Sequence, residues 1–165
     1  RWADMLIDTS ELSANELQQF VRQNFETQEA GELTVTVSSF GFARGMPPLA
    51  DLVFDMRFLD NPHWHDDLRD LTGLDEPVAE FLRQTDGFEE NFVRIRDLLF
   101  DLLPRYQAQG KSYVHIAFGC TGGRHRSVYT AERIAHALCE NGFKPTTTHR
   151  NLASRAADAV ELQTA

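Results

Sequence analysis

The chain has 165 residues, of which 42% are hydrophobic and 12 are phenylalanine; this composition excludes a disordered chain and fits one globular domain. Its formal net charge of −9 argues against a general polyanion-binding protein, because non-specific binding to nucleic acid needs a positive field. No uninterrupted apolar stretch approaches the roughly 18 residues that span a membrane, and the two cysteines, Cys120 and Cys139, are too few for a disulfide framework, so we expect a cytoplasmic protein with no membrane partner.

The amino-terminal third of the chain predicts one helix followed by two strands. Ser13 and Glu16 form an S-x-x-E capping box, and apolar residues recur at helical spacing from Leu17 to Phe25. The polar stretch 26–32 has the composition of a linker. Residues 33–40 alternate and are rich in β-branched side chains, which predicts a strand, and residues 52–58 predict a second strand. A long polar loop over residues 60–73 follows.

The rest of the chain predicts helices alternating with strands. The sequence Asp-Glu-Pro at 75–77 opens a short helix. A second helix, which we expect to be ended by Pro104 and then Gly110, carries an apolar stripe: Phe88, Phe92, Ile95, Leu99 and Leu102. Residues 113–118 are almost continuously apolar, as in a strand buried on both faces. A helix with apolar residues from 128 to 138 and Gly142 as its stop precedes a last strand at 145–149. This order predicts an α/β fold with a mainly parallel central sheet flanked by helices.

The stretch FGCTGGRHRSV, residues 118–128, joins the buried strand to the helix that follows it. N–H groups at a helix start have no intrahelical partners, and the helix dipole places partial positive charge there. Glycines let a backbone close around an anion, and arginine forks suit phosphate. The sequence therefore predicts an anion-binding loop of eight consecutive residues: Cys120, Thr121, Gly122, Gly123, Arg124, His125, Arg126 and Ser127. The alternative is a tight turn with solvated arginines.

The same loop also fits the C-x5-R-S spacing of cysteine phosphatases, in which a thiolate attacks phosphorus. Cys120, Arg126 and Ser127 occupy the three fixed positions. However, Gly119 stands where those enzymes usually have a histidine, and no general-acid aspartate can be assigned. No nucleotide P-loop motif occurs either. We therefore expect Cys120 to be a small residue in a crowded turn, and we expect no enzymatic activity from this chain.

A second cluster of polar and aromatic residues follows the strand 52–58. Ligands usually bind at the carboxyl ends of the strands in an open α/β sheet, so Asn61, His63 and Trp64 are expected to face the glycine loop across a crevice. His149 and Arg150, at a strand end, are expected to reach the same crevice. His115 lies within the buried strand and is expected to be a hydrogen-bonded core residue. The histidines and aspartates of residues 63–67 lack further ligand spacing, so no metal site is predicted.

With these residues assembled, the chain resembles the C-terminal domain of the RapZ/YvcJ family. The matching stretches, in the same order, are SFGFARGMP, LVFDMRFLDNPHW, TGLDEPV, GCTGGRHRSV and HRNL. The resemblance implies that residues 1–30 are the last strand and helix of an upstream P-loop kinase-like domain, that residues 31–152 form a sugar-phosphate-sensing domain, and that residues 153–165 are a tail. It also implies that ATP or GTP binds in the missing N-terminal domain, so no cofactor is expected in this chain, and that the protein forms homo-oligomers.

For enterobacterial members, the resemblance implies a domain that senses glucosamine-6-phosphate and presents small regulatory RNA to an endoribonuclease, and so controls amino-sugar synthesis. The phosphate is then expected on the glycine loop and the sugar near Asn61 and His63. Candidate RNA contacts, expected with Arg126 near one end of the sheet, are Arg124, Lys144, His149, Arg150 and Arg155. RNA-binding members end in a Lys/Arg-rich tail, whereas Arg155 is followed here by AADAVE. Two alternatives stay open: a cysteine-dependent phosphatase and a structural oligomerisation domain.

Overall fold

The structure is a computed structural model that describes residues 7–10, 12, 17, 20 and 33–152. The Ser13–Glu16 capping box and the tail from Ala153, both singled out in the sequence, lie outside the described residues. The amino-terminal and carboxy-terminal parts of the predicted division into domains therefore stay predictions, and the account below concerns mainly residues 33–152.

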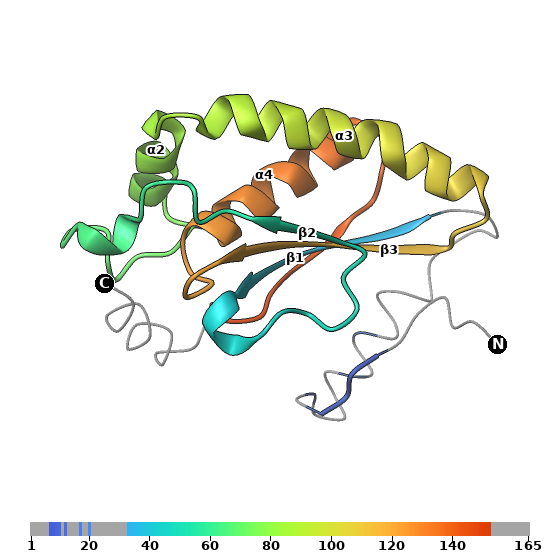
Figure 1. Cartoon of the computed structure of the whole chain (residues 1–165), viewed down its shortest axis with the longest axis horizontal. Helices are drawn as coiled ribbons and strands as arrows, with labels where there is room; N and C mark the ends of the chain where they lie inside the picture. Colours follow the sequence, from blue (N-terminus) through green and yellow to red (C-terminus); the bar gives the residue numbers. More distant parts are fainter. Residues whose placement is uncertain (1–6, 11, 13–16, 18–19, 21–32, 153–165) are drawn as a thin grey trace.

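Four strands form one sheet in the order β2-β3-β1-β4, and every neighbouring pair is parallel. The arrowheads of β1, β2 and β3 accordingly point the same way in Figure 1. In chain order the elements are β1 (Thr34–Gly41), η1 (Phe42–Arg44), β2 (Leu52–Asp55), η2 (Pro62–Trp64), α2 (Glu76–Gln84), α3 (Phe88–Ala108), β3 (Tyr113–Cys120), α4 (Arg126–Glu140) and β4 (Thr146–His149). The predicted α/β class with a parallel sheet is confirmed.

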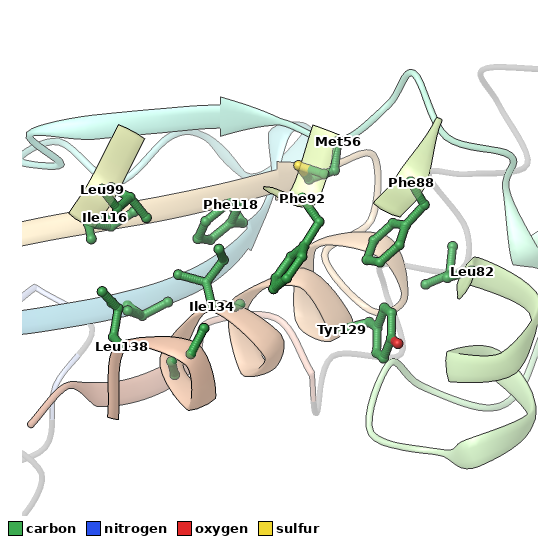
Figure 2. Close-up of a cluster of buried hydrophobic side chains, with 14 of the residues drawn as sticks. Met56, Leu82, Phe88, Phe92, Leu99, Ile116, Phe118, Tyr129, Ile134 and Leu138 are labelled. Atoms are coloured by element: carbon green, nitrogen blue, oxygen red, sulfur yellow. The ribbon is translucent and has the colours of Figure 1, made fainter. Parts of the chain in front are cut away.

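The main core lies between one face of the sheet and the helices. Alternate residues of a strand point to opposite faces, and Val35 and Val37 of β1 lie in register with Val114 and Ile116 of β3. All four are completely buried or nearly so, and belong to the same core cluster. Helix α4 packs on β1, β3 and β4, with α3 alongside it (Figure 1). Leu99 of α3 and Ile134 and Leu138 of α4 point toward Ile116 and Phe118 (Figure 2).

Strand β2 is shorter than predicted. Residues 52–58 were expected to be extended, but the ladder ends at Asp55, after which Met56 N–H still donates to Gly119 O at 2.7 Å. The Asp55 carboxylate then accepts a hydrogen bond from the backbone N–H of Arg57 at 2.9 Å. This side chain turns the main chain away from the sheet, because an aspartate that bonds two residues ahead favours a turn over a strand.

Helix α3 continues past Pro104 to Ala108, so the prediction that the proline ends the helix is wrong, whereas the other predicted stop, Gly110, follows directly after the C-cap residue Gln109. Pro104 is exposed, so its ring lies on the solvent side of the helix. Leu99 and Leu103 are completely buried on the opposite side of the helix. Their burial outweighs the loss of one main-chain hydrogen bond on the solvent side. The buried stripe accordingly runs through Leu103, whereas the predicted Leu102 is only partly buried.

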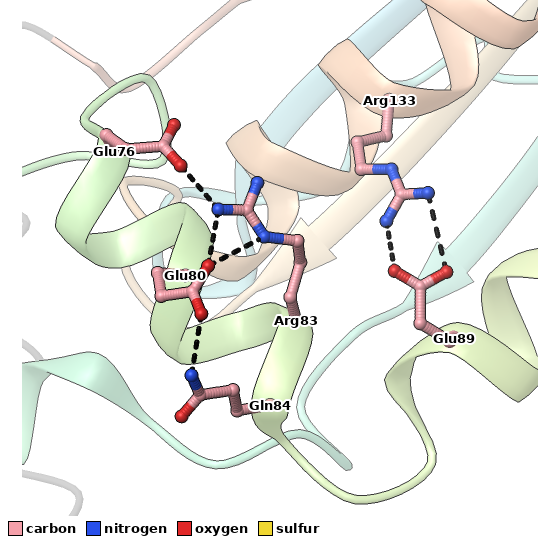
Figure 3. Close-up of polar contacts among 6 residues, drawn as sticks. All are labelled: Glu76, Glu80, Arg83, Gln84, Glu89 and Arg133. Atoms are coloured by element: carbon pink, nitrogen blue, oxygen red, sulfur yellow. Dashed lines mark hydrogen bonds and ion pairs between the residues drawn. The ribbon is translucent and has the colours of Figure 1, made fainter.

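Ion pairs form within α2 and between α3 and α4 (Figure 3). Arg83 bonds Glu76 and Glu80 within α2. Arg133 of α4 bonds Glu89 at the start of α3, and its guanidinium carbon lies 4.1 Å from the centre of the Phe92 ring. Because Arg133 combines a charge pair with an aromatic stack, it fixes α3 and α4 relative to each other more firmly than an exposed ion pair alone would.

Candidate functional site

The glycine loop lies at the carboxyl edge of the sheet. Strand β3 ends at Cys120 and α4 begins at Arg126, so residues 121–125 join them directly. The last residue of β1, Gly41, is in register with Cys120. In Figure 1 this edge is the one toward which the arrowheads point. The loop therefore occupies the place where ligands bind in open parallel sheets, with the start of a long helix on one side.

Cys120 lies at the base of the loop and is bonded to both of its ends. Its side chain is almost fully buried, at 1% exposure. The sulfur accepts a hydrogen bond from Gly123 N–H at 3.3 Å and lies 3.1 Å from Ser127 Oγ. The thiol thus ties the end of β3 to the turn and to the first turn of α4.

Two glycines allow the loop to lie directly against the end of β1. Gly123 has φ of 78°, and a Cβ there would lie 2.6 Å from Gly41 N. A Cβ on Gly41 would lie 2.7 Å from the carbonyl carbon of Gly122. Neither position has room for a side chain. Close packing of main chain therefore accounts for these glycines, and the case for a ligand must come from other residues.

Arg126 provides that case. Its side chain is 4% exposed, and the guanidinium donates to Leu59 O at 3.1 Å and to Thr121 Oγ1 at 3.3 Å. Its Nε is buried and has no hydrogen-bond partner, and no carboxylate of the described residues lies within ion-pair distance. A buried charge is costly unless an opposite charge neutralises it, and the adjacent helix start adds further positive potential. An anion at this point would compensate both.

Arg124 and His125 have structural contacts instead. The Arg124 guanidinium donates to Asp70 O at 2.8 Å, and its own carbonyl accepts from Gly73 N–H, also at 2.8 Å. His125 is buried, and its carbonyl accepts from Tyr129 N–H in the first turn of α4. Of the two predicted arginine forks, Arg124 therefore braces the neighbouring segment, whereas Arg126 lies inside the loop region.

Asp55 and Arg57 adjoin the loop, although neither was among the predicted site residues. They form an ion pair of 2.6 Å, with their side chains 45% and 49% exposed. The Arg57 guanidinium lies 4.1 Å from the centre of the Phe42 ring, and the Arg57 carbonyl accepts from the Arg126 guanidinium at 3.5 Å. Hydrogen bonding from Arg57 lowers the pKa of Asp55, and the charge of Arg126 lowers it further. The signal that was overlooked is an acidic residue at the carboxyl end of a strand.

The segment that contains Asn61, His63 and Trp64 is attached to the loop at both ends. Leu59 bonds Arg126, and Asp70 bonds Arg124. Asn61 Oδ1 accepts from His63 N–H at 3.4 Å and caps η2. The His63 side chain is buried, whereas Trp64 is half exposed. Among the described residues, no hydrogen bond or ring contact joins Asn61 or Trp64 to residues 120–127. Their predicted role in binding the sugar stays a prediction.

The basic residues expected near one end of the sheet are dispersed. Lys144 precedes the first residue of β4, so it lies at the amino edge, opposite the glycine loop; its predicted position was wrong because parallel strands all begin at that edge. His149 bonds Ser39 Oγ at 2.8 Å and Glu132 at 3.0 Å, and so clasps β4 to β1 and α4. Arg150 contributes to a cavity on the other face of the sheet. Arg155 lies outside the described residues.

Within residues 33–152 and the few described residues before them, no three His, Cys, Asp or Glu side chains gather in a way that could hold a metal ion. Over the same residues, no helix has both the length and the apolar character that crossing a membrane requires. His115 shares a hydrogen bond with Ser38 Oγ at 2.7 Å, as predicted, but its side chain is only partly buried and lines a cavity, so it is not a core residue.

Comparison with known proteins identifies relatives of this sequence. The model of the RapZ C-terminal domain matches residues 33–153. A protein named nucleotide-binding protein from Erythrobacter litoralis is 67% identical over 98% of this chain and 54% of its own length. Proteins of the same name from Novosphingobium aromaticivorans and Zymomonas mobilis are 65% and 52% identical, over 98% and 91% of this chain. The chain spans about half the length of these curated relatives.

Proposed function

Because this chain belongs to the RapZ C-terminal domain family, we propose that it is a regulatory domain that binds an amino-sugar phosphate, of the glucosamine-6-phosphate kind, at the glycine loop. The observation that carries the proposal is the buried guanidinium of Arg126, which lies at the start of α4 without a carboxylate partner among the described residues. Binding would supply the missing negative charge, and release of the ligand would leave the positive charge of Arg126 uncompensated again. A domain of this kind responds to a metabolite and does not convert it.

The phosphate is proposed to sit between the guanidinium and the first turn of α4. Arg126 is held by Leu59 O and Thr121 Oγ1, which fixes the direction of its remaining N–H groups. The N–H groups of the first helical turn have no acceptor within α4 and point out of its start. A phosphate that accepts from both sets gains charge-assisted hydrogen bonds and a favourable interaction with the helix dipole.

The amino group of the sugar is proposed to pair with Asp55. The pKa of Asp55 is lowered by hydrogen bonds from Arg57, so this carboxylate is ionised at neutral pH. It is also half exposed, and can therefore contact a ligand without losing all of its hydration. The phosphate at one end of the ligand would then pair with Arg126, and the ammonium group of the sugar would pair with Asp55.

Phosphatase chemistry is less well supported by the same geometry. The thiol of Cys120 has the hydrogen-bond donors that a nucleophile in a C-x5-R-S loop needs. A leaving group, however, also needs a proton, and the neighbouring carboxylate of Asp55 is the wrong form to donate one because its pKa is lowered. We therefore propose that Cys120 is structural and that this chain does not hydrolyse phosphate esters.

We further propose that this chain assembles into homo-oligomers, and that ATP or GTP binds in the part of its relatives that lies outside this chain. Those relatives carry the name nucleotide-binding protein. A role in presenting small RNA to an endoribonuclease would use several copies of this domain, since the basic residues Arg124, Lys144 and Arg150 lie apart.

Calorimetry with glucosamine-6-phosphate tests the main proposal. Arg126→Met keeps the apolar volume and removes the charge, and it should lower affinity about tenfold or more, because a charge-assisted hydrogen bond contributes about 1.5 to 3 kcal/mol. Arg105→Met, an exposed change on α3, is the matched control and should bind like the original chain. Equal affinity in all three proteins would remove the glycine loop from the proposal.

A further inference from the structure

A cavity lies on the face of the sheet that points away from α4. Its volume is about 500 Å³. The strand residues that line it are Thr36 and Ser38 of β1, Tyr113 and His115 of β3, and Thr148 of β4. Along β1 and β3 these residues alternate with the valines buried under the helices, and Thr148 of β4 lies in register with Ser38. They therefore point to the opposite face of the sheet. The cavity is therefore separated from the glycine loop by the plane of the sheet, and it is not part of the site proposed above.

The floor of this cavity is polar where a parallel sheet is usually apolar. Strands of such sheets are normally covered on both faces and carry Val, Ile and Leu. Here Thr36 and Ser38 are buried, at 4% and 1% exposure. Ser38 Oγ is bonded across the strands to His115 Nε2 at 2.7 Å, which fixes a hydroxyl and an imidazole group in position before any ligand arrives. Thr36 Oγ1 is buried and has no hydrogen-bond partner among the described residues, so a ligand that bonds this hydroxyl would remove the cost of leaving it unpaired.

The walls differ in character from the floor. One side is apolar and rigid, formed by Pro47, Pro48 and Leu49. The rim carries charges of both signs in equal number: Asp8 and Asp51 against Lys111 and Arg150. Asp51 is paired with Lys111 at 2.7 Å and also accepts from the backbone N–H of His115 at 2.8 Å. The balanced rim gives a polyphosphate no net attraction, whereas the apolar wall suits a flat ring.

We infer that this cavity binds an uncharged, nucleoside-like ligand, with a flat ring against Pro47 and Pro48 and hydroxyl groups on the floor of Ser38, Tyr113 and Thr148. The volume is within the range of small-molecule sites, which are mostly apolar with a few placed polar groups. A free hexose offers too little apolar surface for the proline wall, and a nucleoside triphosphate carries charge that the rim does not compensate.

Ligand-observed NMR and calorimetry with adenosine, guanosine and uridine at millimolar concentration test the inference. At least one should bind, and the ring-proton resonance of His115 should shift on its addition, because that ring lines the cavity. The variant Tyr113→Phe with Thr148→Val removes two hydroxyls with little change in shape. It should weaken binding about fivefold or more, as expected for the loss of two neutral hydrogen bonds.

Two controls separate this site from the glycine loop. Arg126→Met should bind the nucleoside as tightly as the original chain, and the double variant should still bind glucosamine-6-phosphate, which also shows that it folds. The inference is overturned if no nucleoside binds, if glucose binds as well as the nucleosides do, or if binding leaves the His115 resonance unmoved. Loss of nucleoside binding in Arg126→Met alone would equally overturn it.

Discussion

At the scale of single residues, Asp55 and Arg57 show how one turn can serve both the fold and a ligand. The carboxylate turns the chain at the end of β2 by bonding Arg57 N–H, and it also pairs with the Arg57 guanidinium. The guanidinium in turn lies over Phe42. The carboxylate is therefore held in place and ionised before any ligand binds, so that little conformational entropy is lost when one does.

We expect Asp55→Asn to discriminate between two ligands. Glucosamine-6-phosphate should lose about fivefold to tenfold in affinity, since the ammonium loses its charged partner. Glucose-6-phosphate, which has no amino group, should lose little. Calorimetry at neutral pH measures both. If the two ligands lose affinity equally, Asp55 acts by positioning Arg57 and does not contact the amine.

His115 makes the stability of the fold depend on pH. Burial lowers the pKa of His115, with Arg150 adding to this effect and Asp51 opposing it. The unfolded chain therefore takes up a proton at about pH 6.5, where the folded chain does not. The free energy of unfolding should fall as the pH decreases from about 6.5 toward the lower folded-state value, and should not depend on this residue above 6.5.

Urea denaturation of the original chain and of His115→Gln over this pH range measures the contribution. The two curves of stability against pH should run parallel above about 6.5 and diverge below it, because only the original chain has an imidazole to protonate at this position. Parallel curves throughout would mean that the pKa of His115 is the same in the folded and the unfolded chain, which would contradict the prediction.

At the scale of elements, the join between β3 and α4 depends on main-chain contacts with the end of β1. Gly41 N–H donates to Asn151 Oδ1 at 2.8 Å, and Ala43 N–H donates to Thr121 O at 3.2 Å. Together with the close approach of Gly123, these bonds make β1, the loop and the residues after β4 one packed unit. A change in any one of them should disturb the position of Arg126.

Gly123→Ala should therefore destabilise the chain more than Gly110→Ala does, because the two glycines have similar φ angles but only Gly123 is packed against main chain. Gly110 has φ of 80° and no atom within 4 Å of a built Cβ, so Gly110→Ala should cost only the left-handed backbone penalty, about 1 kcal/mol. Gly123→Ala adds a collision with main chain and should cost about 2 kcal/mol or more beyond that. Chemical denaturation of both variants gives the comparison, and equal losses would contradict it.

The sequence predicted elements well where local pattern and tertiary packing agree. The strands at β1, β3 and β4 and the helices α2 and α4 are confirmed, because alternation, apolar runs and stop signals all favour the same structure there. It failed at Pro104 and at the end of β2, where burial of Leu103 or one side-chain hydrogen bond decides the outcome. The loop residues could be listed from sequence, but which arginine is buried could not, since that depends on the segment that folds over it.

At the scale of the whole molecule, the sheet has two unlike faces. The face under α3 and α4 is apolar, and the face toward the cavity carries hydroxyls and an imidazole. One candidate ligand site thus lies at the carboxyl edge of the sheet and the other on its polar face, with β1 contributing to both through Gly41 and Ser38. Strand β1 is the element through which one site would influence the other.

The dispersed basic residues predict weak RNA binding by a single copy of this chain. Arg124 is braced against Asp70 and Lys144 lies at the opposite edge, so we expect about two phosphate contacts. At about 0.7 per contact, the slope of log affinity against log salt for single strands should lie between about −1 and −2. Filter binding over a salt series, with light scattering to establish the number of copies, measures it. Tight binding by a monomer at high salt would contradict the prediction.

The unequal burial of the two thiols has a practical consequence for measuring how the glycine loop moves. Cys139 is exposed near the end of α4, whereas Cys120 is covered by Gly123 and Ser127. Iodoacetamide should alkylate Cys139 in the intact chain and reach Cys120 only when the loop separates from the first turn of α4. The ratio of the two alkylation rates, read by mass spectrometry, therefore reports the opening equilibrium of the loop. A sugar phosphate bound there should slow the reaction of Cys120 and leave that of Cys139 unchanged.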